Sequence, residues 1–302
     1  VVTESGQFHL EILNSLSDVA ASDWNSLLPF DAGPFLKHEF LSSLEETGCV
    51  GDNTGWQVAH LVLKSDQGIV GAIPLYLKQH SYGEYVFDWS WAQAYEPQGM
   101  NYYPKALCAI PFTPVQGSRF LVKPGLDRAL FISKLIAGLK SLVQNNHLSS
   151  AHVLFPKEEE IELLKAHGFL LRDSVQFHWQ NQNYKDFDQF LSALTMKRRK
   201  NIRREREIVS AQNITFRHIP GRDSTDQDWE FFYACYANTY YEHQSQPYLN
   251  ESFFKLWASR SPEDLHLIVA HRDGLPIASS LLVVDTAMSK AYGRYWGALE
   301  HI

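Results

Sequence analysis

A short segment near residue 80 carries three polar side chains that could take part in proton transfer. His80, Tyr82 and Glu84 stand at alternate positions, and alternate side chains of a β-strand share one face. Asp88 follows in the same segment. An amine nucleophile must lose a proton before or during attack, and a carboxylate, imidazole or phenol can accept it. We therefore expect these four residues to be catalytic, with Glu84 as the base. A plain solvated strand face is the alternative.

Candidate substrate contacts lie farther along the chain. Residues 89–125 form an irregular stretch rich in aromatic residues and proline, on which a cation could hold a phosphate or carboxylate. Near the end of the chain, Arg294 lies between Tyr292 and Trp296 on one expected strand face, where it could stack on the rings or anchor an anionic substrate. His178 could instead be a partly buried, hydrogen-bonded imidazole. The expected substrate-binding residues are Tyr103, Lys105, Thr113, Arg119, His178, Arg294 and Trp296.

A cluster of basic residues at 197–206 is the strongest charge feature of the sequence. The chain has a net charge of -7, yet this segment holds seven cations and only one acid. Thr195 is the expected N-cap of a helix here. Six cations would cover about half of that helix: Lys197, Arg199, Lys200, Arg203, Arg204 and Arg206. Like charges four residues apart destabilise a helix by roughly 0.2–0.5 kcal/mol per pair, so the pattern predicts a compensating anion. The tRNA backbone, a lipid-linked pyrophosphate and the acidic remainder of the protein all stay open.

The chain contains an internal repeat. Residues 60–72 and 266–278 both read as strand, turn and strand, with a turn built on Asp and Gly. Residues 81–85 match 291–295, which predicts a third strand in each copy. Helical patterns precede both hairpins, so the order helix, helix, strand, strand, strand occurs twice. Two unrelated hairpins with common turn residues are the alternative.

Only the first copy continues beyond its expected third strand. Helical spacing predicts helices over 126–146 and 158–167, and apolar runs predict strands over 150–155 and 169–180. The second copy has no counterpart of these elements within the sequence. We therefore expect the second domain to be incomplete in this chain.

Composition excludes several classes of protein. A length of 302 residues with 45% hydrophobic residues favours two globular domains. The cysteines Cys49, Cys108 and Cys235 form no CxxC pair, so neither a disulfide framework nor a zinc ribbon is expected. Motifs of metalloproteases, serine hydrolases and nucleotide-binding loops are absent, and no metal is expected. With no long apolar run and no signal stretch, we expect no transmembrane segment and a soluble, cytoplasmic protein.

Several strings of the sequence carry a resemblance to a known family. They are PFLKHEFL at 34–41, HSYGEYVFDWSWA at 80–92, YYPK at 102–105, PFTPVQG at 111–117, QFHW at 176–179, KRRKNIR at 197–203 and GRYWG at 293–297. The chain resembles the FemAB-like family of acyltransferases, which is associated with peptidoglycan biosynthesis or recognition. The resemblance implies a mixed α/β fold with two GNAT-like acyl-CoA N-acyltransferase domains, at residues 1–180 and 181–302.

The same resemblance implies a reaction without a permanently bound cofactor. Acyl-CoA or aminoacyl-tRNA would be the donor, and an amine on a small molecule or cell-wall precursor would be the acceptor. The donor stays open because residues 115–118, Val-Gln-Gly-Ser, stand where a GNAT enzyme carries its pyrophosphate-binding loop. We expect the site between the domains, with tRNA contacting the basic helix if it is the donor.

Two other functions and the oligomeric state stay open. The chain could be a non-catalytic module that recognises a cell-wall precursor or RNA. It could also be a scaffold whose basic helix docks within the molecule, in which case salt bridges should surround residues 197–206.

Overall fold

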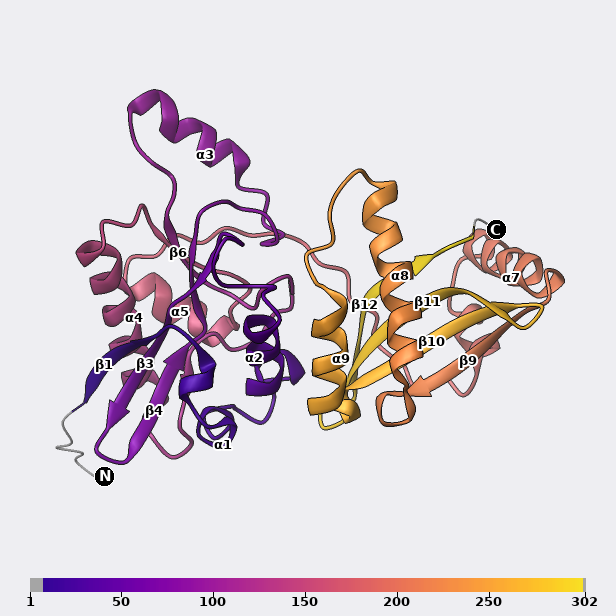
Figure 1. Ribbon diagram of the computed structural model, residues 1–302, viewed down its shortest axis with the longest axis horizontal. Helices are drawn as coiled ribbons and strands as arrows, with labels where there is room; N and C mark the ends of the chain where they lie inside the picture. The colour runs from indigo at the N-terminus through magenta and orange to yellow at the C-terminus, as the bar shows by residue number, and fades with distance from the viewer. Residues whose placement is uncertain (1–7, 301–302) are drawn as a thin grey trace.

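The computed structural model describes residues 8–300 and shows a mixed α/β fold. This confirms the fold class that the sequence predicts. Within that range the strands form three four-stranded sheets (Figure 1). We call the residues up to 180 the first half and those from 181 the second half, following the boundary expected from the sequence. No helix in the described range is long and apolar enough to cross a membrane.

The first half contains two of the sheets. One is antiparallel and consists of β1 (His9–Leu13), β3 (His60–Ser65), β4 (Gly68–Ile73) and β7 (Leu121–Val122). The other consists of β2 (Trp56–Val58), β5 (Leu75–Lys78), β6 (Lys105–Cys108) and β8 (Ala151–Val153), and its β6–β8 pair is parallel. Pro74 separates β4 from β5, because proline has no N–H to donate to a ladder.

The first half also contains helices. They are α1 (Ala21–Asn25), α2 (His38–Glu46), α3 (Trp89–Tyr95), α4 (Arg128–Asn145) and α5 (Glu158–Ala166). Helix α4 begins where the Asp127 side chain accepts a hydrogen bond from the backbone of Leu130, as an N-cap does. It packs against β3 and β4 through a core that contains Leu61, Leu63 and Leu135. Helix α3 projects away from the rest of the half (Figure 1).

The second half contains one antiparallel sheet. Its strands are β9 (Ile214–Pro220), β10 (Leu265–Arg272), β11 (Leu275–Asp285) and β12 (Lys290–Ala298). The helices are α6 (Phe187–Ser192), α7 (Met196–Ala211), α8 (Asp226–Glu242) and α9 (Glu251–Arg260). Helix α8 packs on β11 and β12. It lies so close that a Cβ on Gly297 would overlap the carbonyl of Cys235.

The repeat is present in the structure, except for one strand. Helices α1 and α2 precede the β3–β4 hairpin, as α8 and α9 precede the β10–β11 hairpin. The prediction of a third strand at residues 81–85 of the first copy is wrong. This segment makes turns, with positive φ at Gly83 (81°), Tyr85 (62°) and Phe87 (50°). Such angles interrupt the alternation that an extended strand requires.

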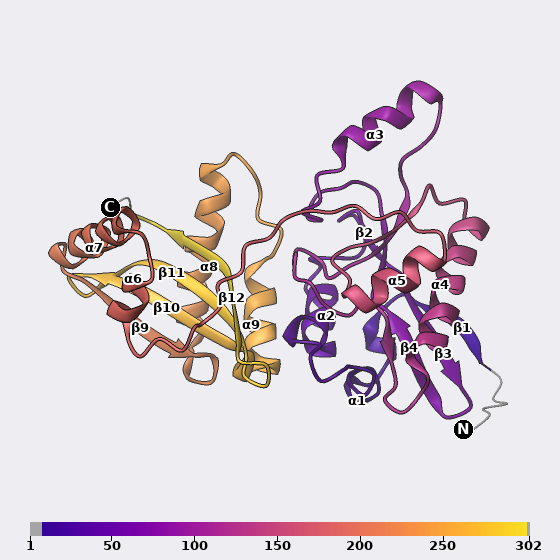
Figure 2. The ribbon, with the colours of Figure 1, turned by 180° about the vertical axis from the view of Figure 1, so that it is seen from behind.

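The strand expected over 169–180 is also wrong. These residues form no strand, and an extended, exposed segment crosses from α5 to α6 behind the molecule (Figure 2). By contrast, the helices expected over 126–146 and 158–167 are α4 and α5, and the strand expected over 150–155 is β8.

The two halves meet at an interface, which we call the seam, and the centre of this interface is an aromatic core. The ring of Phe40 on α2 lies 5.7 Å from that of Phe253 and 4.8 Å from that of Trp257, both on α9. The ring of Phe35 lies 5.2 Å from that of Tyr292 on β12. All five residues belong to one continuous hydrophobic cluster.

Ion pairs flank the aromatic core of the seam. Lys37 Nζ lies 2.6 Å from Asp264 Oδ2, and Arg260 Nη2 lies 2.8 Å from Glu46 Oε2. Each pair joins a residue of the first half to one of the second. Aromatic contact at the centre with charge pairs at the edge resembles a stable protein–protein interface.

We expect Phe40→Ala to lower the free energy of unfolding by about 3–5 kcal/mol, because it removes a buried ring from both halves at once. Urea denaturation of the full chain measures this loss. Phe30→Ala is the matched control, since that ring is 81% exposed. An equal effect of the two substitutions would contradict the seam's contribution.

Candidate functional site

A buried charge cluster fixes the segment that follows β5. Lys105, the first residue of β6, has no solvent exposure, and its Nζ lies 2.9 Å from Glu84 Oε2, 2.6 Å from Asp88 Oδ2 and 3.0 Å from Ser81 Oγ. The hydroxyl of Tyr102 donates to Asp88 Oδ2 at 2.6 Å. One lysine thus binds three residues of the 80–88 segment.

The cluster also includes Tyr103, whose hydroxyl lies 2.7 Å from Ser81 Oγ. Burial would raise the pKa of Asp88, but hydrogen bonds from Lys105, Ser81 and Tyr102 lower it to about 2. Burial raises the pKa of Glu84 although Lys105 opposes the shift. Glu84 Oε1 and Asp88 Oδ1 are buried without a hydrogen-bond partner among the described residues.

This geometry gives no support to Glu84 and Asp88 as catalytic groups. Both side chains are buried and bind Lys105, and Glu84 does not share a strand face with His80 and Tyr82 as expected. Both ring nitrogens of His80 have hydrogen-bond partners. Nε2 lies 3.1 Å from the carbonyl oxygen of Thr54, and Nδ1 accepts a hydrogen bond from the backbone N–H of Tyr82 at 3.2 Å. The side chain of Tyr82 is exposed. His80, Glu84 and Asp88 bind within the loop, Tyr82 is exposed on it, and the four residues do not line one cleft.

Lys78 is a second buried cation beside this cluster. Its ammonium group lies 3.8 Å above the ring of Trp56 and donates to the carbonyl of Tyr82 at 3.3 Å. No carboxylate of the described residues lies within 4.0 Å of it. Burial lowers the pKa of Lys78 from its ordinary value of 10.5 to about 7.

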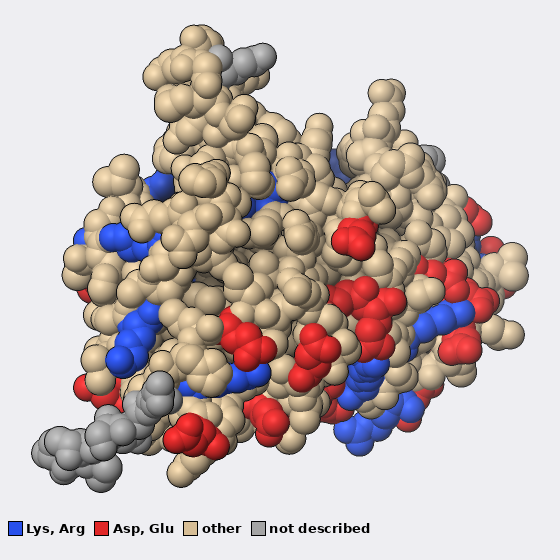
Figure 3. All heavy atoms as spheres, turned by 60° about the vertical axis from the view of Figure 1, so that its left-hand side comes forward, with Lys and Arg blue, Asp and Glu red and all other residues tan. Residues whose placement is uncertain are grey.

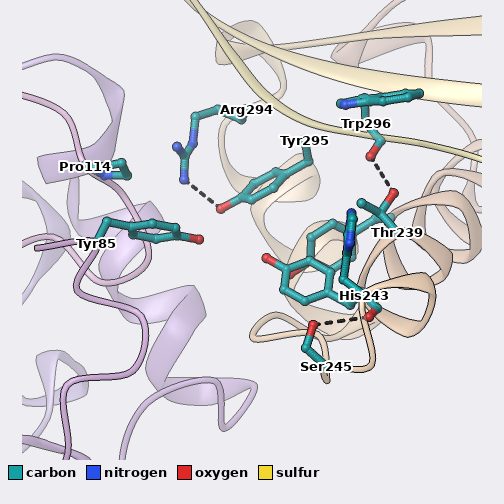
Figure 4. Close-up of a pocket in the computed structure, with 10 residues that line it drawn as sticks. Tyr85, Pro114, Thr239, His243, Ser245, Arg294, Tyr295 and Trp296 are labelled. Carbon is teal, nitrogen blue, oxygen red and sulfur yellow. Dashed lines mark hydrogen bonds between the residues drawn. The ribbon is translucent and has the colours of Figure 1, made fainter. Parts of the chain in front are cut away.

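A pocket of about 320 Å³ opens where the 80–88 loop meets the second half (Figure 4). The first half contributes Tyr85 and Pro114, and α8, the turn after it and β12 contribute the other walls. The lining residues are Tyr85, Pro114, Tyr236, Thr239, Tyr240, His243, Ser245, Arg294, Tyr295 and Trp296. Burial raises the pKa of the Tyr85, Tyr236 and Tyr295 hydroxyls, so these phenols stay protonated and can donate hydrogen bonds.

Arg294 reaches across the seam from a β-bulge in β12. Leu281 pairs with Tyr295 and Leu282 with Gly293, so Arg294 is left without a partner in the ladder. A bulge re-aims the side chain of its extra residue. Nη2 of Arg294 donates to the carbonyl of Phe112 at 2.5 Å. It also donates to the hydroxyl of Tyr295 at 2.8 Å (Figure 4).

The same bulge corrects the expected arrangement of the β12 side chains. Tyr292 pairs with Val283 and Trp296 with Ser280, so these two rings lie on opposite faces of the sheet. Tyr292 packs in the seam, whereas Trp296 is 66% exposed at the pocket. Arg294 lies over the ring of Tyr295, 4.7 Å from its centroid.

The structure brings only some of the expected substrate contacts to this pocket. Thr113 lies beside it, 3.3 Å from Nη2 of Arg294, and Trp296 lines it. Tyr103 and Lys105 belong to the buried cluster instead. Arg294 also lines the pocket, whereas Arg119 and His178 do not.

Arg119 and His178 correct two further expectations. Arg119 is fully buried, and its guanidinium donates to three backbone carbonyls, including that of Leu154 at 2.7 Å, so it is a structural residue. His178 is exposed on the crossing segment, 3.3 Å from Gln176 Oε1, and the expected partial burial is wrong.

Sequence reasoning missed most of the second-half wall. Tyr236, Thr239, Tyr240 and His243 occur at the spacing i, i+3, i+4 and i+7, which places them on one face of α8. That spacing was available in the sequence. Tyr85 could not be placed in this wall from the sequence, because a regular strand was expected over residues 81–85 and the chain turns there instead.

Helix α7 carries the expected basic face. Thr195 is its N-cap, as predicted, and accepts from the backbone of Arg198. Arg203 lies 3.5 Å from Asp188, and Arg206 lies over the ring of Phe187. The salt-bridge network that a docked scaffold helix requires is missing from the described part of the chain. The helix lies at the end of the second half away from the first (Figure 1), so polyanion binding by its cations stays a prediction.

On the face in Figure 3, most of the visible charged side chains lie on the lower part of the molecule. The residues of α3 include no charged side chain. Among the described residues, no group of three or more His, Cys, Asp or Glu could hold a metal ion. The three cysteines are buried and unpaired.

The family model for FemAB-like proteins, described as peptidoglycan biosynthesis and recognition, matches residues 15–302. The chain belongs to the FemAB-like family. No curated protein matches this FemAB-like chain.

Two solved structures are similar in part to this FemAB-like protein. A tandem GNAT protein from the clavulanic acid biosynthesis pathway is 12% identical, covering 98% of this chain and 80% of its own, with a TM-score of 0.43. An aminoglycoside N-acetyltransferase, AAC(6')-Iy with CoA, is 16% identical, covering 60% of this chain and 99% of its own, with a TM-score of 0.35.

We expect Lys78→Met to change how stability depends on pH. The pKa of Lys78 falls from 10.5 when unfolded to about 7 when folded, so between these values the unfolded chain binds more protons. Stability of the parent should therefore rise with pH across this window. The variant should lack that contribution and be more stable than the parent below pH 7. Urea denaturation from pH 6 to pH 10 measures both.

Lys64→Met is the matched control for this experiment, because Lys64 is partly exposed and pairs with Glu11. It should keep the pH dependence of the parent. Identical slopes for the parent and Lys78→Met would contradict the burial of an unpaired ammonium.

If RNA is the polyanion that α7 binds, its affinity should fall steeply as salt increases, because the cations of the helix displace counterions from phosphates. The double reversal Arg199→Glu with Arg203→Glu should flatten the slope of log affinity against log salt. The control is Lys134→Glu with Lys140→Glu on α4, which makes the same change in charge elsewhere. Salt-independent binding, or equal effects of the two doubles, would contradict this assignment.

Proposed function

We propose that this FemAB-like protein is an N-acyltransferase that uses the pocket at the seam. The observation that carries the proposal is a pocket lined by both halves, in which the His243 imidazole, several protonated tyrosine hydroxyls and the Arg294 guanidinium converge. Family membership and the sequence resemblance support the reaction class. A concave site with a few convergent polar groups is also where chemistry is expected in a protein.

Acyl transfer to an amine involves three chemical events at such a site. A base must take a proton from the amine, and His243 is the imidazole among the lining residues. As the C–N bond forms, the carbonyl oxygen becomes an oxyanion, which protonated phenols such as Tyr85 and Tyr295 stabilise by donating hydrogen bonds. The bond from the acyl carbon to sulfur or oxygen of the donor then breaks, and the leaving group takes up a proton.

The donor is an activated acyl group, either a thioester of CoA or an aminoacyl ester of tRNA. The acceptor is a small amine or the amine of a cell-wall precursor. The thioester is the simpler hypothesis, because its test needs no RNA. If tRNA is the donor, the basic face of α7 would contact it.

The direct test is an assay of the full chain with acetyl-CoA and a panel of amines, following thiol release. We expect His243→Gln to lower kcat/KM by a hundredfold or more, within the range of roughly 10²–10⁴ for loss of a general base. His218→Gln is the matched control, because His218 on β9 contacts His266 and does not line the pocket.

The outcomes of this assay separate the candidate functions. A His243→Gln variant within twofold of the parent would remove His243 from the mechanism. If no thiol is released, aminoacyl-tRNA is the next donor to supply. Binding of acceptor amines without transfer from either donor would contradict an enzyme and favour a recognition module.

A further inference from the structure

The charge of the pocket lining is unbalanced. Among its lining residues only Arg294 carries a permanent charge, and none is aspartate or glutamate. No carboxylate of the described residues lies within 4.0 Å of the Arg294 guanidinium. A half-buried cation without a counter-ion is unfavourable, because burial weakens its hydration.

The hydrogen bonds of Arg294 satisfy only part of its guanidinium. All three involve Nη2 and neutral acceptors: the carbonyl of Phe112 and the hydroxyls of Thr113 and Tyr295. Nε is buried without a partner, and Nη1 makes no hydrogen bond to the described residues. The protein therefore holds this side chain in place over the ring of Tyr295, but sets no carboxylate of the described residues against it and leaves two of its nitrogens without a hydrogen-bond partner.

A second arginine at the seam shows what compensation looks like in this molecule. Arg260 Nη1 and Nη2 lie 2.9 Å and 2.8 Å from the two carboxylate oxygens of Glu46. Both arginines cross between the halves, but only the one outside the pocket has an internal counter-ion. The difference indicates that the partner of Arg294 is not among the described residues.

We infer that Arg294 is the specificity determinant of the pocket and binds a carboxylate of the acceptor. One guanidinium cancels one negative charge, which matches a carboxylate better than a pyrophosphate. A volume of about 320 Å³ is at the small end for ligand sites and suits an amino acid or a short peptide. The acceptor is thus an amine that also bears a carboxylate, and polycationic amines are repelled because the lining has no acid.

That the bound carboxylate belongs to an acceptor rests on the proposed transferase function. Binding of a carboxylate to Arg294 does not depend on that function, so the experiment measures binding in the absence of an acyl donor. Calorimetry of the full chain compares each of several amino acids and dipeptides with its own carboxamide, for example alanyl-alanine with alanyl-alaninamide. Spermidine tests a polycation, and inorganic phosphate tests a phosphate group as the source of the anion.

We expect at least one acid to bind about tenfold more tightly than its amide, as for a hydrogen bond to a charged group. Arg294→Gln should abolish that preference and Arg294→Lys should keep part of it. Arg272→Gln should leave it unchanged, because Arg272 lies on the same sheet but pairs with Glu300. Urea denaturation of each variant checks that it is folded.

Several results would overturn the inference. They are equal binding of acids and amides, no acid bound at millimolar concentration, a preference that survives Arg294→Gln, tight binding of spermidine, and displacement of the acid by micromolar phosphate. Carboxylate binding without acyl transfer would leave the inference standing and refute the proposed reaction. Acyl transfer without a preference for carboxylates would refute the inference and leave the proposed reaction standing.

Discussion

The aromatic seam is the interaction on which the rest of this structure depends. Phe40 contacts two rings of α9, and Phe35 contacts a ring of β12, so the cores of the two halves are continuous. The pocket exists only because this packing brings the loop of one half against α8 and β12 of the other. Arg294 illustrates the dependence, since its hydrogen bond to the carbonyl of Phe112 requires both halves in place.

The first half must also hold its contribution to the pocket in a fixed position. Tyr85 lies in a segment with repeated positive φ, which an ordinary extended chain would not adopt. Lys105 binds residues on both sides of Tyr85 in sequence, namely Ser81, Glu84 and Asp88. Even when buried charges are paired, the cost of removing them from water can exceed the gain from their attraction, so we interpret the cluster as fixing the geometry of the loop rather than adding stability.

Sequence reasoning reached the architecture better than the site. Hydrophobic patterns and turn residues were enough for both hairpins, for α4 and α5, and for the N-cap of α7, because these are local features. The pairing of Lys105 with Glu84 bridges two segments that periodicity does not connect. Likewise, one extra residue in β12 reverses the face of every side chain beyond it, and only the register of the ladder reveals that. The domain limits and the donor remain predictions.

The most direct test of the account is native-state hydrogen exchange of the full chain. If the seam makes the halves one cooperative unit, the slowest amides of β3 and β4 and those of β10 and β11 should report the same opening free energy. Both sets should lose protection together in Phe40→Ala. A second half that opens at a markedly lower free energy than the first would contradict the shared core, and with it a preformed pocket between the halves.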